Sequence, residues 1–228
     1  MNQADLVFVT GDMFIPDRCP DIPEQFKSSL SPGKLQHVLS LGNIGSRESY
    51  DWLKSLSNNF HAVKGEFDEG NLPDTKVVQI GDFKIGMIHG HQITPWGDAE
   101  ALSNIQRQLD CDILLSGHTH VNNVSVYDGK YYINPGSISG AYSPLVSDPV
   151  PSFILMVIQG DYAIVYIYEL NDKTKKFDVS KMEFTKNSSQ LKNVESNDND
   201  NEEEEVEQEE GEGENENETQ NENETQND

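Results

Sequence analysis

Cysteine and positive charge are both scarce in this sequence. Its two cysteines, Cys19 and Cys111, stand far apart among 228 residues, which excludes a disulfide framework and is typical of a reducing compartment. No apolar run reaches membrane-spanning length, and the first residues, MNQADLVFVTGD, lack the basic region and long apolar stretch of a signal peptide. We therefore expect a cytoplasmic protein.

Basic residues are absent altogether from the end of the chain. Residues 195–228 contain 17 Asp or Glu, no Lys or Arg, and Val206 as their single aliphatic residue. Such a segment cannot bury enough apolar surface to offset the entropy of ordering it. We expect residues 187–228 to form a disordered Asn/Glu-rich tail. The alternative is an electrostatic docking arm that recruits a basic partner.

The rest of the chain is only mildly acidic. Residues 1–194 contain 23 acidic and 16 basic residues, so their net charge is -7, against -24 for the whole chain. They form no basic patch, and an acidic surface is repelled by phosphate backbones and by anionic lipid headgroups. The composition therefore argues against nucleic-acid binding and against direct membrane insertion.

Hydrophobic periodicity predicts an α/β fold. Short runs rich in Val, Ile and Leu alternate with helix-period segments between residues 6 and 64, which is the spacing of a parallel βαβαβ unit. Strands follow at 76–80, 83–89 and 113–115, with a helix at 98–109, and the segments 123–127, 131–134, 153–159, 162–170 and 177–184 favour antiparallel strands. We predict one domain, residues 1–186, in which two sheets pack face to face with helices outside.

Polar side chains stand next to glycine at the predicted strand ends. The candidates for metal ligation are Asp12, Asn43, Glu66, His89, His118 and His120. Side chains at the carboxyl ends of parallel strands converge on one crevice. Oxygen and nitrogen donors without thiolates suit Zn, Mn or Fe, and two such ions about 4 Å apart clamp a phosphoester. Any one of these residues alone is more often part of a turn or a hydrogen-bonded histidine, but their order predicts a shared metal site.

The order of these motifs, GD, GN, GEFD, HGH and GHTH, resembles the calcineurin-like metallophosphoesterase superfamily. That superfamily usually shows D-x-H, GD, GN-[HC]-D, H and GH-x-H. The longer stretches GNIGSRESYDWLK, KIGMIHGHQITPWGD and YYINPGSISGAY are similar to the small subunits of the retromer coat. The resemblance covers residues 1–186 and implies a metallophosphoesterase-type two-sheet sandwich flanked by helices, an αββα arrangement.

The departures from the superfamily pattern bear on activity. By resemblance, Phe14 replaces a nitrogen donor, Asn43 replaces the bridging carboxylate, and Phe67 replaces the histidine that protonates the leaving group. A phenyl ring has no proton to give. Glu66 replaces an Asn ligand. We expect at most one divalent ion, Zn or Mn, weakly held at the second of the two family sites, or an empty site.

The resemblance implies a non-catalytic scaffold subunit of retromer that acts in endosome-to-Golgi, or retrograde, transport and is peripheral on endosomal membranes. It implies that the helical-solenoid retromer subunit holds the metal-pocket face, with Ile93, Thr94 and Trp96 on the rim. It also implies that an apolar surface on the opposite side accepts regulators of small GTPases. The matching residues of that surface are Leu155, Tyr166 and Tyr168, which periodicity alone assigns to the core.

The alternative function is a divalent-metal-dependent phosphodiesterase. Enzymes of this kind can cleave diesters with good leaving groups without a general acid. The surviving histidines His89, His118 and His120 favour this hypothesis.

Overall fold

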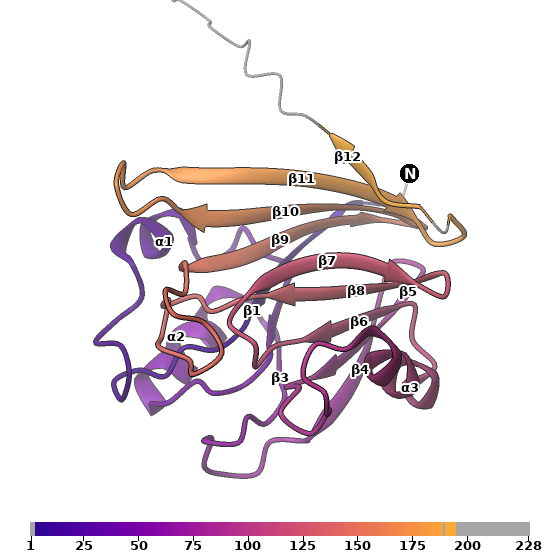
Figure 1. Ribbon diagram of the computed structural model, residues 1–228. Helices are drawn as coiled ribbons and strands as arrows, with labels where there is room; N and C mark the ends of the chain where they lie inside the picture. The colour runs from indigo at the N-terminus through magenta and orange to yellow at the C-terminus, as the bar shows by residue number, and fades with distance from the viewer. Residues whose placement is uncertain (1–2, 189, 195–228) are drawn as a thin grey trace, which may run out of the picture. The chain divides into compact units, whose positions relative to one another are not determined.

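A computed structural model of the chain describes residues 3–188 and 190–194. These residues lie in one compact unit in which two β-sheets pack face to face (Figure 1). Residues 195–228, on which most of the expected tail falls, lie outside the described residues. Among the residues that are described, no helix is long and apolar enough to cross a membrane.

The first sheet begins with the predicted parallel unit. Its strands are β1 (Asp5–Thr10), β2 (His37–Ser40) and β3 (Asn59–Ala62), and they are connected by α1 (Glu24–Ser29) and α2 (Arg47–Leu56). Val38 pairs in parallel with Phe8 on one side and with Phe60 on the other. Ser46 caps α2 by accepting a hydrogen bond from the Ser49 amide. The predicted βαβαβ connection is confirmed.

The same sheet is completed by antiparallel strands from the end of the chain. These are β9 (Ser152–Gln159), β10 (Tyr162–Leu170), β11 (Phe177–Thr185) and β12 (Lys192–Val194), and the strand order is β12-β11-β10-β9-β1-β2-β3. The short strand β12 lies beyond residue 186, where the sequence places the end of the domain. Its three residues, Lys-Asn-Val, carry no alternating pattern that would have predicted a strand.

The second sheet is mixed. Its strands are β4 (Thr75–Ile80), β5 (Phe83–Ile88), β6 (Ile113–Ser116), β7 (Asn122–Tyr127) and β8 (Lys130–Pro135), in the order β4-β5-β6-β8-β7. Strands β5, β6 and β8 are parallel, and α3 (Ala99–Leu109) connects β5 to β6. Asp128 and Gly129 both have positive φ, which matches the right-handed twist of the β7–β8 hairpin.

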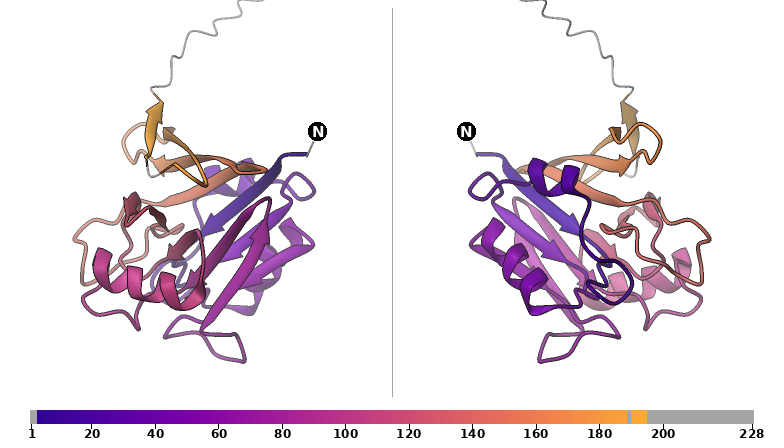
Figure 2. Two further views of the ribbon diagram at one scale, coloured as in Figure 1. Left: turned by 90° about the vertical axis from the view of Figure 1, so that its right-hand side faces the viewer. Right: turned by 90° about the vertical axis from the view of Figure 1, so that its left-hand side faces the viewer.

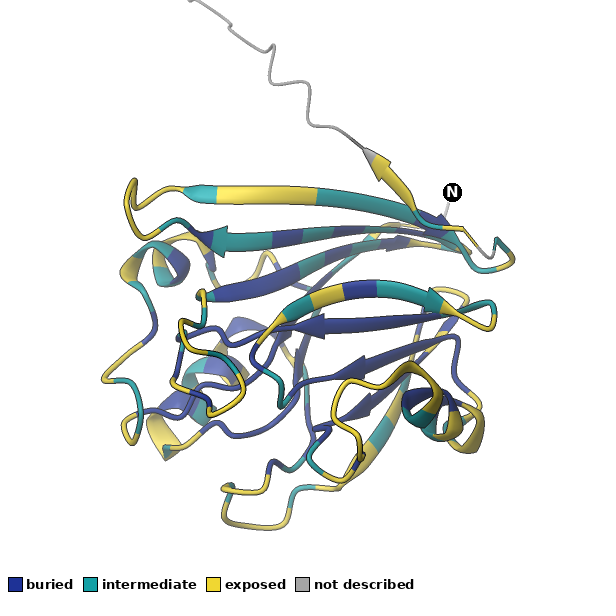
Figure 3. Cartoon of the chain, in the orientation of Figure 1, coloured by how far each residue is buried: buried dark blue, intermediate teal, exposed yellow. Residues whose placement is uncertain are grey.

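Apolar residues on the facing sides of the two sheets form the central core. Val9, Leu39, Leu115 and Met156 are fully buried there, and Figure 3 shows the buried residues concentrated in the strands. Helices α1 and α2 lie against the outside of the first sheet and α3 against the second (Figure 2). The two-sheet sandwich with flanking helices is therefore as predicted.

One segment ties the two sheets together at one end. We call residues 136–141, which leave β8, the strap. Ser137 forms isolated bridges with both Asp12 and Pro151, and its hydroxyl donates a hydrogen bond to the Asp12 carbonyl at 2.8 Å. The Ser139 hydroxyl donates to the Met13 carbonyl at 2.6 Å. The strap thus joins the second sheet to the ends of β1 and β9 in the first.

Candidate metal centre

The six predicted metal ligands meet at the end of the sandwich that the strap closes. Each follows a strand on its carboxyl side: β1, β2, β3, β5 and β6 contribute, in order, Asp12, Asn43, Glu66, His89 and the pair His118 and His120. Gly65 allows the loops after β2 and β3 to touch, because a Cβ atom there would lie 2.4 Å from the Asn43 nitrogen. The strand ends therefore bring these six residues together, as expected for the carboxyl ends of parallel strands.

Asp12 lies at the centre of the group and is fully buried. Its Oδ1 accepts a hydrogen bond from the Asn43 side-chain nitrogen at 2.8 Å, and its Oδ2 accepts one from the His118 amide at 2.9 Å. The Nε2 atoms of His89 and His120 lie 3.6 and 3.5 Å from Oδ1. Burial disfavours the charged carboxylate, but His120, His89 and Asn43 outweigh it and hold the pKa of Asp12 below its usual value.

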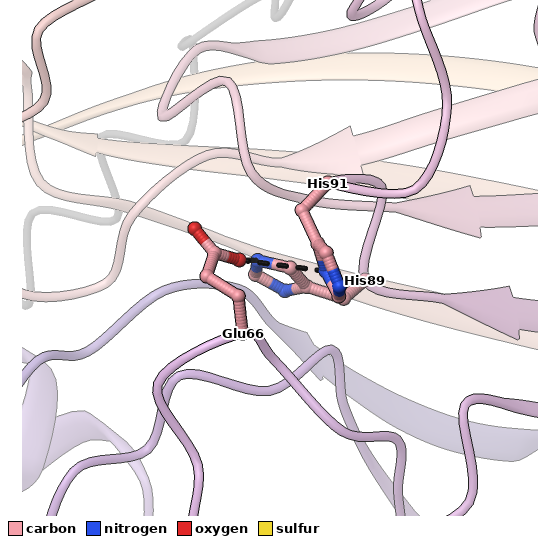
Figure 4. A group of neighbouring side chains, drawn as sticks. All are labelled: Glu66, His89 and His91. Atoms are coloured by element: carbon pink, nitrogen blue, oxygen red, sulfur yellow. Dashed lines mark ion pairs between the residues drawn. The ribbon is translucent and has the colours of Figure 1, made fainter.

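Glu66 reaches into the group from the more exposed side. One of its carboxylate oxygens lies 2.8 Å from His89 Nε2 and 3.4 Å from His91 Nδ1. Figure 4 shows these three side chains facing one another. The other lies 3.3 Å from His118 Nδ1. Burial opposes ionisation of Glu66, but bonds from His118 and His89 dominate and lower its pKa far below the usual range. The carboxylate is therefore charged at neutral pH.

Two histidines are oriented by backbone carbonyls. His89 Nδ1 lies 2.6 Å from the Leu41 carbonyl oxygen, and His120 Nδ1 lies 2.7 Å from that of Ala141. A carbonyl can only accept, so Nδ1 carries the proton in both rings and Nε2 faces the carboxylates. Metal-bound histidines are held in this way in proteins. Burial disfavours the charged ring of His89, but Glu66 and Asp12 raise its pKa.

Asn43 presents its side-chain nitrogen, rather than its oxygen, to the centre of the candidate ligand atoms. That nitrogen lies 2.8 Å from Asp12 Oδ1 and 3.0 Å from His89 Nε2, while its oxygen accepts a hydrogen bond from the Phe67 amide at 3.1 Å. The Phe67 amide needs an acceptor, which fixes this orientation. The hydrogen atoms of the Asn43 NH₂ group therefore point toward Asp12 Oδ1 and His89 Nε2, two atoms that could otherwise bind a cation.

The backbone around the group is held in an unusual conformation. Phe14, Asn43, His118 and His120 all have positive φ, between 50° and 70°, which is uncommon for residues other than glycine. Asp68 stabilises part of it by accepting hydrogen bonds from the amides of Asn43, Ile44 and Gly65 at 2.7 to 2.9 Å. Such strain concentrates at functional sites.

Aromatic rings surround the opening above the histidines. The Phe14 and Phe67 rings contact each other, and the Arg18 guanidinium lies 3.8 Å from the centre of the Phe14 ring. Trp96 lies against the His118 ring with 4.7 Å between centroids. These side chains line a cavity of about 340 Å³ together with Leu145. The mouth of the site is thus mainly aromatic and carries one guanidinium, whereas its floor carries carboxylates and imidazoles.

Comparison with known proteins identifies the family. Residues 6–161 match the calcineurin-like phosphoesterase superfamily domain. Vacuolar protein sorting-associated protein 29 (Vps29) of Schizosaccharomyces pombe is 41% identical over 186 residues, which span 79% of this chain and 98% of the relative. The chain belongs to the Vps29 family.

Solved structures of Vps29 show the same fold. Vps29 from Cryptosporidium parvum superposes with a TM-score of 0.77 at 41% sequence identity. The match covers 80% of this chain and 98% of the C. parvum chain. Vps29 from Entamoeba histolytica, solved in complex with Zn²⁺, gives a TM-score of 0.72 at 48% sequence identity. The match covers 80% of this chain and 99% of the E. histolytica chain. The metallophosphoesterase-type sandwich is therefore shared across the Vps29 family.

The donor set of this Vps29 family member fits a zinc ion. Ligand atoms of Glu66, His89 and His91 all lie within 4.8 Å of one another, and imidazole nitrogen with a carboxylate is a set that zinc accepts. The buried His118 Nε2 has no hydrogen-bond partner among the described residues. His91 was not among the predicted ligands, although the second histidine of the HGH motif was the signal that could have found it.

The predicted partner-binding residues fall in two separate places. Thr94 and Trp96 are exposed on the loop after β5, and Trp96 exposes 48% of its surface. Ile93 on the same loop is buried beneath α3, so its side chain offers little area to a partner. Leu155 and Tyr166 are half-buried neighbours on β9 and β10, paired across the ladder.

Proposed function

We propose that the chain is a non-catalytic scaffold subunit of the retromer complex, cytoplasmic and peripheral on endosomal membranes, that serves endosome-to-Golgi protein transport. Membership of the Vps29 family supports this assignment. The observation that carries the non-catalytic part is the pair of phenyl rings, Phe14 and Phe67, in contact at the opening of the candidate metal centre. They give the opening the character of a docking surface rather than that of a phosphate-binding site.

The chemistry of phosphoryl transfer argues in the same direction. Such transfer depends on positioned charge and on a proton for the leaving oxygen. Phe67, which is 58% exposed at the mouth, has no proton to donate. Asn43 directs its NH₂ group toward Asp12 and His89, where a bridging carboxylate would screen two cations from each other. The site therefore supports at most one ion, Zn or Mn, with Glu66, His89 and His91 as its nearest donor set.

The helical-solenoid retromer subunit is the partner we assign to the metal-centre face. Trp96 is the best anchor there, because it is large, half-exposed and rigidly placed beside His118. We expect Trp96→Asp to abolish recovery of the purified solenoid subunit in a pulldown. The matched control is Tyr127→Asp, since Tyr127 is 40% exposed at the turn end of β7, away from this face. Unchanged recovery with Trp96→Asp would contradict this part of the proposal.

Regulators of small GTPases are the partners we assign to the outer face of the first sheet. Tyr166 pairs with Leu155 across the β9–β10 ladder, and Tyr168 stacks on Phe153 with 4.8 Å between centroids. Half-buried aromatic and aliphatic side chains on one sheet face form a recognition patch. We expect Tyr166→Ser to weaken binding of a purified regulator fragment while binding of the solenoid subunit stays normal. Equal loss of both would indicate misfolding.

The alternative function, a metal-dependent phosphodiesterase, is favoured by one observation. Glu66, His89 and His91 already present clustered ligand atoms. The test is hydrolysis of bis(p-nitrophenyl) phosphate by the purified full chain with Mn²⁺, beside His89→Ala. Turnover that disappears in His89→Ala would support the enzyme, and equal rates in both proteins would support the scaffold.

A further inference from the structure

Arg18 differs from the other arginines of the chain in having no acidic partner among the described residues. The sequence contains three arginines. Arg47 lies 2.9 Å from the Asp51 carboxylate, and Arg107 lies 3.8 Å from that of Asp128. In the described part of the chain, no carboxylate lies within ion-pair distance of the Arg18 guanidinium. Its positive charge is therefore not neutralised by an ion pair there, although the chain as a whole is acidic.

The Arg18 side chain is held against the aromatic rings at the mouth of the metal centre. Its guanidinium carbon lies 3.8 Å from the centre of the Phe14 ring and 4.9 Å from that of Phe67. Its Nη1 donates a hydrogen bond to the Tyr142 carbonyl at 3.1 Å. A guanidinium has five N–H donors in one plane, and this is the one that has an acceptor among the described residues. The rings and the carbonyl therefore position the cation and leave most of its donors free.

The cavity at the mouth combines this cation with exposed apolar side chains. Arg18 lines it beside Phe67, Trp96 and Leu145, and these three side chains are exposed. The carboxylate that lines the same cavity is that of Glu66, which lies against histidines instead of Arg18. The cavity thus offers apolar area and one unused cation to a partner.

A carboxylate is the anion that suits these donors. A guanidinium binds a carboxylate through two parallel N–H···O bonds, and stacking of its face on aromatic rings leaves the donors in its plane free for them. Apolar neighbours lower the local dielectric and strengthen such a pair. A phosphate group could meet the same donors, but its higher charge would be repelled more strongly by the Glu66 carboxylate in the same cavity.

We propose that Arg18 pairs with an Asp or Glu side chain that the helical-solenoid subunit presents beside its apolar contacts at the mouth of the metal centre. This inference rests on the proposed function, which assigns that subunit to this face. The aromatic rings supply contact area, and Arg18 supplies selectivity. A surface of the same shape without the carboxylate would bury the guanidinium without a partner, which is costly.

The kinetics of binding between the full-length chain and the purified solenoid subunit, measured by surface plasmon resonance, test the proposal. Arg18→Gln removes the charge but keeps a planar group that can donate to the Tyr142 carbonyl. Arg18→Lys keeps the charge but loses the paired donors. The matched control is Arg107→Gln, which removes the same charge from an exposed position on α3. Urea unfolding of each variant verifies that it is folded.

We expect Arg18→Gln to dissociate at least about tenfold faster than the unaltered chain. Arg18→Lys should dissociate at an intermediate rate, and Arg107→Gln at the unaltered rate. Unchanged dissociation of Arg18→Gln would overturn the inference, and it would leave the proposed function intact if Trp96→Asp still abolished binding. Failure of the unaltered chain to bind the solenoid subunit would overturn both.

Variants of the solenoid subunit test whether the partner group is a carboxylate. Each of its acidic residues is changed in turn to the corresponding amide. One such change should speed dissociation from the unaltered chain about as much as Arg18→Gln does, and should add little when it is combined with Arg18→Gln. If every amide variant adds its full effect to that of Arg18→Gln, the acceptor is a neutral group and the proposed ion pair is wrong.

Discussion

The rings of Phe14 and Phe67 meet edge to face, with 5.4 Å between their centroids and 63° between their planes. Edge-to-face contact is a favourable aromatic geometry, and Arg18 stacks over both rings. Phe14 makes this contact from a backbone with φ of 50°, and its side chain is buried, so packing holds the ring in position. The opening of the metal centre is thus a mainly aromatic surface that also presents the Arg18 guanidinium.

Restoring the polar residues of the superfamily pattern should restore chemistry. We expect the triple variant Phe14→His, Asn43→Asp and Phe67→His to hydrolyse p-nitrophenyl phosphate with Mn²⁺ at least about 100-fold faster than the unaltered chain, because it regains a donor, a bridge and an acid. Phe67→His alone should not, since the bridge is still missing. A large increase in the hydrolysis rate from Phe67→His alone would show that Asn43 does not prevent catalysis.

Zinc affinity should depend on His89. Replacing it by alanine removes the imidazole that lies nearest to Glu66, and we expect at least about a tenfold loss of Zn²⁺ affinity by titration calorimetry. His37→Ala is the control, because His37 lies on β2 at the far end of that strand from Asn43. A similar loss in both variants would mean that the measured zinc binds elsewhere.

The Asp68 carboxylate should be important for stability. It accepts backbone hydrogen bonds from Asn43, Ile44 and Gly65, and Asp68→Asn would turn an NH₂ group toward at least one amide. We expect a decrease of about 2–3 kcal/mol in the free energy of unfolding, measured by urea denaturation. Asp17→Asn, at an exposed carboxylate, should change it by less than about 0.5 kcal/mol.

Alanine at Gly65 should damage the site through a steric clash. Its Cβ would lie 2.2 Å from Asn43 Oδ1, so the loops after β2 and β3 must separate. We expect Gly65→Ala to cost about 2–3 kcal/mol of unfolding free energy and to weaken Zn²⁺ binding. Gly70→Ala is the control, since Gly70 has φ of 99° but open space around it. It should cost about 1 kcal/mol and leave zinc binding unchanged.

The two cysteines should differ in reactivity. Burial raises the pKa of Cys111 to about 11, whereas Cys19 is partly exposed. At pH 8, iodoacetamide should label Cys19 and spare Cys111 in the native protein, as mass spectrometry of the peptides would show. Because the folded-state pKa of Cys111 is raised, its contribution to stability is complete below pH 9 and decreases as the pH rises toward 11. Cys111→Val should reduce that alkaline decrease.

The order and type of the main elements could be predicted from the sequence, because each buried strand between β1 and β11 is a short apolar run bounded by glycine or polar residues. Element ends moved by one or two residues, as in α3, which was predicted at 98–109 and begins at Ala99. Strand β12 escaped prediction, since its pairing with β11 depends on tertiary context. Hydrophobic periodicity does not predict that β9 pairs with β1 either.

The residues of the candidate metal centre were predictable as a group, since glycine-flanked polar residues at successive strand ends converge in an open sheet. Their individual orientations were not. The sequence could not show that Asn43 directs its nitrogen inward, or that His91 approaches Glu66. The burial of Ile93 under α3 could not be predicted either, because it depends on packing between distant segments.

The strap has a mechanical consequence. Ser137 and Ser139 tie the end of β8 to the residues that follow β1. The Ser137 carbonyl also accepts a hydrogen bond from the Ser152 amide at 2.8 Å. The two layers are also tied at the opposite end, where the Asp82 amide donates a hydrogen bond to the Gly160 carbonyl at 2.9 Å and Lys186 lies 2.8 Å from Asp112. Because the sandwich is tied at both ends, separation of the layers at the strap must break the Ser137 and Ser139 bonds together, and we expect Asp12 and its neighbours to keep their spacing.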